Sequence, residues 1–157
     1  MTCIDFAFGA ADRLRAACQL LYKHYLAGQR IVVYCSDGTR LAAFDRMLWT
    51  FDDTAFVPHV LVSSPLAAET PVVLTAAEPQ AAATLFAASQ SAAWLLNLDD
   101  QCPPGYHGFT HLLEIVSDDP ADRQAARLRW RSYGAEGHTV QSHNLSTAPG
   151  VNVGHSE

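Results

Sequence analysis

An alternation of strand and helix patterns over the first fifty residues constrains the fold most. Residues 2–8 alternate polar and apolar side chains, as a strand does, and an apolar stripe at helical spacing runs over 12–28. A buried-type strand pattern at 30–35 and a second helical stripe over 41–49 follow. Because a strand–helix–strand unit joins parallel strands, this order predicts a three-layer α/β domain with a mainly parallel central sheet.

The remaining patterns extend this sheet toward the C-terminus. Further strands are predicted at 59–62, 71–75, 93–98, 111–116 and 138–143, and a helix at 120–133. The Ala-rich stretch 78–91 is compatible with either a helix or a loop. We therefore expect one domain over 1–145, followed by a loose tail of small and polar residues at 146–157.

Composition limits the class of protein. The chain has 157 residues, of which 49% are hydrophobic and 17% charged, as in a soluble globular domain. No apolar run approaches the length of a membrane span, and the N-terminus lacks a signal-type segment, so we expect a cytoplasmic protein without a membrane contact. Four widely spaced cysteines without a C-x-x-C pair predict free, mostly buried thiols.

The basic residues are unevenly distributed. None occurs between Arg46 and Arg123, and then four arginines and two aromatic residues fall within 123–133, a stretch without any acid in a chain of net charge −6. A local basic and aromatic patch on an acidic domain indicates one chosen acidic partner. The negative total charge argues against strong direct binding to nucleic acid.

The spacing of this patch places part of it on one side of the predicted helix. Asp119 and Pro120 are a typical helix start. The side predicted to face outward carries Arg123, Arg127, Trp130 and Arg131; the side predicted to pack on the sheet carries Ala121, Ala125, Leu128 and Ser132. Two interpretations remain open: a surface that grips carboxylates beside an indole, or a solvated helix face with arginines clustered by chance.

Residues 33–40 resemble the active-site loop of rhodanese-like sulfurtransferases. Cys35 ends a strand, and the following helix start and Arg40 would lower the pKa of its thiol. The stretch before Cys35 is too short for the elements that precede this loop in that family, and the acidic strand motif is absent. A sulfurtransferase using Cys35 remains the alternative function.

Other chemistry has weaker signals. No G-x-G-x-x-G or P-loop motif follows either early strand, so no nucleotide cofactor is predicted. His107 and His111 are four residues apart, but Gly105 and Gly108 argue against a helix that would align them. No third ligand is evident, and we predict neither a metal site nor another cofactor.

Two motifs resemble the chi subunit of bacterial DNA polymerase III. They are Leu48-Trp49 followed by the Phe-Val-Pro-His segment at 56–59, and the apolar strand 109–116 followed by the Arg-rich helix. The resemblance extends over about residues 2–145. It implies a Rossmann-like fold and a noncatalytic replication adaptor that binds the psi subunit of the clamp-loader complex and the acidic C-terminal tail of single-stranded DNA-binding protein.

The resemblance also implies site residues. The residues expected to bind the tail, including Arg131 from the same helix face, are Phe56, Val116, Arg123, Arg127, Trp130 and Arg131. Arginines would pair with the carboxylates of the tail, while Phe56, Val116 and Trp130 would house its terminal Phe. Leu48 and Trp49 are the candidate contact for psi.

Overall fold

The computed structural model describes residues 2–84 and 93–145. The predicted tail at 146–157 and the end of the Ala-rich stretch lie outside the described residues, so neither prediction is tested. None of the helices in the described part of the chain combines the length and apolarity that crossing a bilayer requires.

Strands and helices follow each other in the order that the sequence predicts. They are β1 Cys3–Ala10, α1 Arg13–Leu26, β2 Ile31–Tyr34, α2 Gly38–Thr50, β3 His59–Leu61, β4 Val72–Thr75, α3 Pro79–Ala83, β5 Trp94–Asn97, β6 His111–Ser117, α4 Pro120–Ala135 and β7 Thr139–Asn144. Two short 3₁₀ turns, η1 Ala67–Glu69 and η3 Tyr106–Gly108, lie between strands. The Ala-rich stretch therefore contains a helix, α3, at its start.

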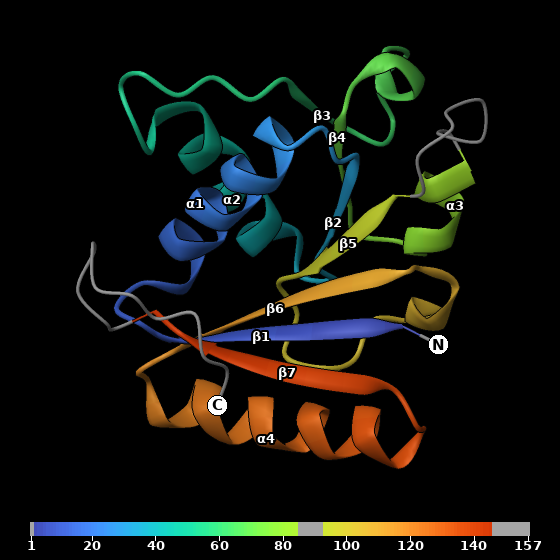
Figure 1. Ribbon diagram of the computed structural model, residues 1–157. Helices are drawn as coiled ribbons and strands as arrows, with labels where there is room; N and C mark the ends of the chain where they lie inside the picture. The colour runs from blue at the N-terminus through green and yellow to red at the C-terminus, as the bar shows by residue number, and fades with distance from the viewer. Residues whose placement is uncertain (1, 85–92, 146–157) are drawn as a thin grey trace.

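In the described residues, seven strands form one sheet in the order β3-β4-β2-β5-β6-β1-β7. Every pairing in it is parallel, which confirms the predicted sheet. Helices α1 and α2 cover one face, and α4 lies across the other face beneath β6, β1 and β7 (Figure 1). The result is a three-layer, Rossmann-like α/β domain with β3 and β7 at its two edges.

Aspartates start the first two helices. The Asp12 carboxylate accepts hydrogen bonds from the backbone N–H groups of Leu14 and Arg15, at 3.0 and 3.3 Å. Asp37 caps α2 in the same way through the N–H groups of Thr39 and Arg40. These caps satisfy donors that have no partner inside the helix and so stabilise the start of each helix.

Two apolar cores lie on the two faces of the sheet. On the α1–α2 face, the helices bury only apolar side chains: Ala17, Cys18, Leu21, Leu41, Phe44 and Leu48. On the other face, Ile4, Phe6 and Leu112 pack with Ala126 and Tyr133 of α4. Both faces of the sheet are therefore covered, as its continuous apolar strands require.

The packed side of α4 differs from the predicted one. Ala126, Arg129 and Tyr133 are buried against the sheet, whereas Leu128 is 61% exposed. The prediction that the side with Ala121, Ala125, Leu128 and Ser132 packs inward is therefore wrong. The reason is Arg129, a charged residue that the prediction placed on neither side and that forms a buried salt bridge with Glu114 of β6.

Candidate functional site

A groove of about 430 Å³ lies between α4 and the strands next to it. We call it the α4 groove. It is lined by Phe6, Phe8, Gly9, Val116, Ser117, Asp118, Arg123, Ala126, Arg127, Trp130, Ser142 and Asn144. These residues come from β1, β6, α4 and β7 and from the β6–α4 connection, so neighbouring elements of one sheet edge build the groove together.

The apolar part of the groove is aromatic. Phe6 and Phe8 are two residues apart on β1 and therefore project to the same face of the sheet. The ring of Phe6 packs on Trp130, with centroids 5.1 Å apart, and on Tyr133 at 5.9 Å. Val116 of β6 adds an aliphatic wall. This surface suits a large apolar side chain.

Two arginines stand beside this apolar surface. Arg123 and Arg127 are exposed and four residues apart on α4, so they lie one turn apart on the same side of the helix. Within the described part of the chain, no carboxylate forms a salt bridge with either one. Their donors are available for an incoming carboxylate, although Asp118 at the groove adds one negative charge.

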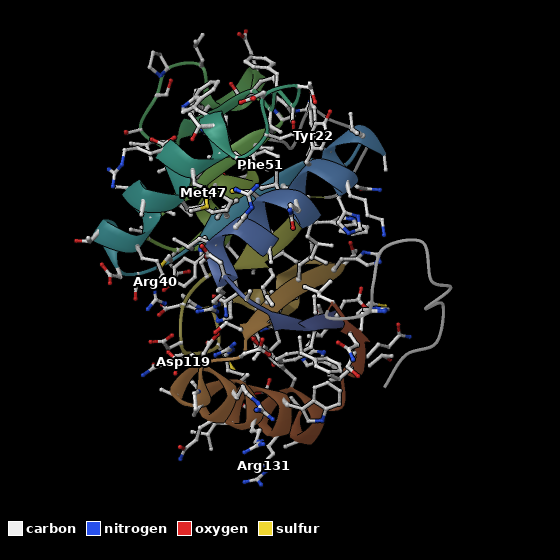
Figure 2. All side chains as sticks on the ribbon, turned by 90° about the vertical axis from the view of Figure 1, so that its left-hand side faces the viewer. Tyr22, Arg40, Met47, Phe51, Asp119 and Arg131 are labelled. Atoms are coloured by element: carbon white, nitrogen blue, oxygen red, sulfur yellow. The ribbon has the colours of Figure 1, made fainter. Side chains whose placement is uncertain are left out.

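The structure thus brings together four of the six residues predicted to bind a peptide tail: Val116, Arg123, Arg127 and Trp130. Arg131 does not line the groove. It lies on the outer side of α4 and points away from the sheet (Figure 2). Its charge is near the groove but outside it.

Phe56 lies elsewhere, at the edge of the sheet that β3 forms. It is 63% exposed, and its ring lies 5.7 Å from that of Trp49. Trp49 is 48% exposed and also packs on His59, with ring centroids 4.1 Å apart. We call Trp49, Phe56 and His59 the Trp49 corner. Leu48, the other residue predicted to contact a partner here, belongs to α2 and is buried in the core.

The α4 groove and the Trp49 corner are separate surfaces. β3 and β6 stand four strand positions apart in the sheet, which corresponds to roughly 19 Å at the usual strand spacing. One phenyl ring cannot contact both surfaces. The predicted pocket of Phe56, Val116 and Trp130 is therefore not assembled in this structure.

Cys35 lies in an environment that favours a neutral thiol. It is buried, and its Sγ donates to the carbonyl oxygen of Leu98 at 3.6 Å. Burial raises the pKa of the Cys35 thiol, against smaller opposing effects of the Asp37 backbone and Arg40. Arg40 itself donates to Leu98 O at 2.8 Å and pairs with Asp100 at 3.1 Å. A thiolate nucleophile gains little support here.

The loop after β5 places carboxylates at the carboxyl ends of the strands. Asp99 accepts a hydrogen bond from the backbone N–H of Ser36 at 3.2 Å, next to the start of α2. Asp100 pairs with Arg40 at 3.1 Å and with Arg13 at 3.4 Å. Among the described residues, no group of three or more His, Cys, Asp and Glu side chains has the geometry of a metal site.

Phe6 and Phe8 are groove residues that sequence reasoning missed. The signal that indicates them is the alternation of β1, which puts Ile4, Phe6 and Phe8 on one face. The partners of that face, Val116 and Trp130, come from distant parts of the chain.

Comparisons with known proteins agree on one family. A family model described as DNA polymerase III chi subunit, HolC, matches residues 1–141. The DNA polymerase III subunit chi of Pseudomonas aeruginosa is 34% identical over 149 residues, covering 92% of this chain and 98% of the relative. The subunits of the same name from Haemophilus influenzae and Escherichia coli are 25% and 26% identical, over 82% and 83% of this chain and 85% and 81% of their own lengths.

Proposed function

Because the chain belongs to the DNA polymerase III chi subunit family, with an accessory role in replication, we propose that it is a noncatalytic adaptor. In this proposal the α4 groove binds the acidic C-terminal tail of single-stranded DNA-binding protein. A second surface binds the psi subunit and so links the chain to the clamp loader. The observation that carries the proposal is the pairing of two arginines with an aromatic surface in one groove.

The chemistry of the groove matches such a tail. A tail that ends in acidic residues, Pro and Phe offers a terminal carboxylate, side-chain carboxylates and one large ring. Arg123 and Arg127 supply planar donor groups that match carboxylates, and the rings of Phe6 and Trp130 offer apolar surface for the terminal Phe. A positive charge on the tail would oppose the arginines, so the groove selects acidic peptides.

The expected affinity is modest. A short peptide buries little area, so binding of one tail is on the order of micromolar. Several tails on one oligomer raise the effective affinity without any new contact. Weak single contacts suit an adaptor, since each contact exchanges quickly.

We further propose that the Trp49 corner contacts psi. Exposed aromatic rings are enriched at protein interfaces, and Trp49 and Phe56 together present two of them. His59 holds this corner in place. Its Nε2 lies 2.9 Å from the Asp45 carboxylate, and its ring packs on the Trp49 ring. On this geometry Phe56 serves the psi contact, and Leu48 supports the corner from inside the core.

A titration tests the tail proposal. A fluorescently labelled peptide with the acidic tail sequence is titrated with the protein, and the same peptide without its terminal Phe serves as the matched control. We expect saturable binding of the intact peptide. The peptide without its terminal Phe should bind about tenfold or more weakly, because it buries no ring against the apolar part of the groove. Equal binding of the two peptides, or no binding of the intact one, contradicts the proposal.

A further inference from the structure

The side of α4 that faces the sheet is held by directional polar contacts. Arg129 is 1% exposed, and its Nε and Nη2 lie 3.2 and 3.1 Å from Glu114 Oε1. The Tyr133 hydroxyl donates to Glu114 Oε2 at 2.5 Å. Two side chains one turn apart on α4 therefore converge on one carboxylate of the sheet.

The Glu114 carboxylate is itself held from the sheet side. Glu114 lies in the interior of β6, where its neighbours across the strands are Phe6 of β1 and Asn97 of β5. Asn97 Nδ2 donates to Glu114 Oε2 at 2.9 Å, and Arg129 Nη1 reaches the backbone oxygen of Asp100 at 2.8 Å. The Glu114 carboxylate, to which α4 is bonded, therefore has a fixed position in the sheet.

Tyr133 remains a donor in this arrangement. Burial, together with the Glu114 carboxylate beside it, raises the pKa of the Tyr133 hydroxyl. The hydroxyl therefore keeps its proton and its hydrogen bond at neutral pH. We call Glu114, Arg129 and Tyr133 the Glu114 cluster.

Helices can pack on this sheet without buried charges. On the other face of the sheet, α1 and α2 are held by buried apolar side chains such as Leu21 and Phe44. A buried ion pair adds little net stability over apolar residues of the same volume, because both charges lose their hydration. What it adds is direction: two hydrogen bonds from one helix face permit one rotation of that helix.

The rotation of α4 determines what the groove presents. Successive residues of a helix point in directions that differ by about 100°. Once the direction of Arg129 is fixed, the direction of Trp130 is therefore fixed as well. Arg127 lies two residues earlier. Ala126, the third buried residue of α4, has a small side chain and offers no directional contact. A turn of α4 would separate the Trp130 ring from Phe6 and aim the arginines away from the groove.

We propose that the Glu114 cluster is a positioning device for the α4 groove: it sets the rotation of α4, and through it the places of Arg123, Arg127 and Trp130. This inference rests on the proposed function of the groove as a peptide site. It assigns a positioning role to three residues that do not line the groove.

The test removes both charges together, because a single change would leave the other charge buried alone. The double variant Glu114→Gln/Arg129→Met keeps an acceptor for Tyr133 and Asn97 and fills the space of the arginine with an apolar side chain. We expect its Tm to stay close to that of the wild type. We expect its Kd for the labelled acidic tail peptide to weaken by about fivefold or more.

A matched control separates position from stability. Leu21→Val perturbs the core on the opposite face of the sheet and lowers Tm, but it should leave peptide affinity unchanged. Unchanged affinity in the double variant, with wild-type binding intact, overturns the inference and leaves the proposed function standing. A wild-type protein that does not bind the peptide overturns the proposed function instead.

A readout without peptide addresses the position directly. In a Trp49→Phe/Trp94→Phe background, the fluorescence of Trp130 reports its packing on Phe6. We expect a red-shifted emission in the Glu114→Gln/Arg129→Met protein, and an unshifted emission contradicts the inference. If the double variant does not fold, Tyr133→Phe decides, since it removes one hydrogen bond and keeps the ring. A peptide Kd within about twofold of the wild type then overturns the inference.

Discussion

The indole of Trp130 packs on the phenyl ring of Phe6 with their planes tilted by 54°. The pair joins the first strand of the chain to its last helix and forms the apolar part of the α4 groove. Trp130 is 37% exposed, so one side of the indole packs and part of it faces solvent. The same indole therefore contributes both to the packing of α4 on β1 and to the surface of the α4 groove.

Replacing Trp130 should affect binding more than folding. Trp130→Ala removes the partly exposed wall of the groove and the ring pair with Phe6, a pair worth about 0.5–1.5 kcal/mol beyond its buried area. We expect peptide affinity to fall by about tenfold or more, with a smaller loss of unfolding free energy. Titration and urea unfolding of the same preparation measure both effects. Trp130→Tyr is the control and should retain most of the affinity.

Arg127 should be the main electrostatic contact of the groove. Arg127→Ala removes a charge-assisted hydrogen-bonding partner, at a cost of about 1.5–3 kcal/mol of binding, which is tenfold or more in affinity. The peptide affinity of this variant should also depend less on salt concentration, because one ionic contact is lost. Arg131→Ala removes the same charge from the same helix but outside the groove, and should weaken binding less. Equal effects of the two changes would show that only the net charge of α4 matters.

The two proposed surfaces should be separable by mutation. Trp49→Ala removes an exposed ring of the Trp49 corner, which lies across the sheet from the α4 groove. We expect loss of psi binding in a pull-down with purified psi, because interface aromatics carry much of the binding energy. Binding of the tail peptide should stay unchanged. A variant that loses both partners would indicate a folding defect, which circular dichroism reveals.

Alkaline pH should weaken the fold through Cys18. Burial raises the pKa of its thiol to about 12, whereas in the unfolded chain a cysteine thiol has a pKa of about 8.5. Between these values only the unfolded state releases the proton, so the unfolding free energy falls with rising pH, by up to about 1.4 kcal/mol per pH unit. Cys18→Ala should show a shallower fall in urea unfolding under reducing conditions. Parallel curves for the two proteins would contradict this assignment.

Cys35 should be chemically quiet. Its thiol is buried and its pKa is raised by that burial, whereas Cys3 is exposed. We expect an alkylating reagent to modify Cys3 first and Cys35 only on unfolding. Cys35→Ser should leave peptide binding unchanged. Sulfur transfer from thiosulfate to cyanide that disappears in Cys35→Ser would restore the sulfurtransferase alternative.

Local patterns predicted the elements of this fold well. The apolar periods over 12–28 and 41–49 correspond to α1 and α2, and the early strand–helix alternation indicated the parallel sheet. The order of the strands in the sheet could not be predicted from local patterns, because it depends on contacts between distant segments. The motif around Phe56 says nothing of β3 lying at the edge away from α4, so its place in the structure could not be predicted.

Charge was the main source of error in α4. The helical wheel placed Arg123, Arg127 and Arg131 outward and assigned Arg129 to neither side, but Arg129 is buried with its salt bridge to Glu114. A signal for this exists in the sequence: Glu114 is the one acid within the apolar stretch 112–116. An acid at a buried strand position requires a buried cation or donors. Which of the four arginines supplies the cation is a property of the tertiary structure.

The loop after β5 has a consequence for what governs this molecule. In parallel α/β sheets, phosphates commonly bind at the carboxyl ends of strands beside a helix start. Here the Asp99 carboxylate takes the Ser36 N–H at 3.2 Å, and Asp100 pairs with Arg40 and Arg13. An attached carboxylate competes at an effective concentration on the order of millimolar or above. The domain therefore carries its own counter-ion at the place where sheets of this kind commonly hold a phosphate.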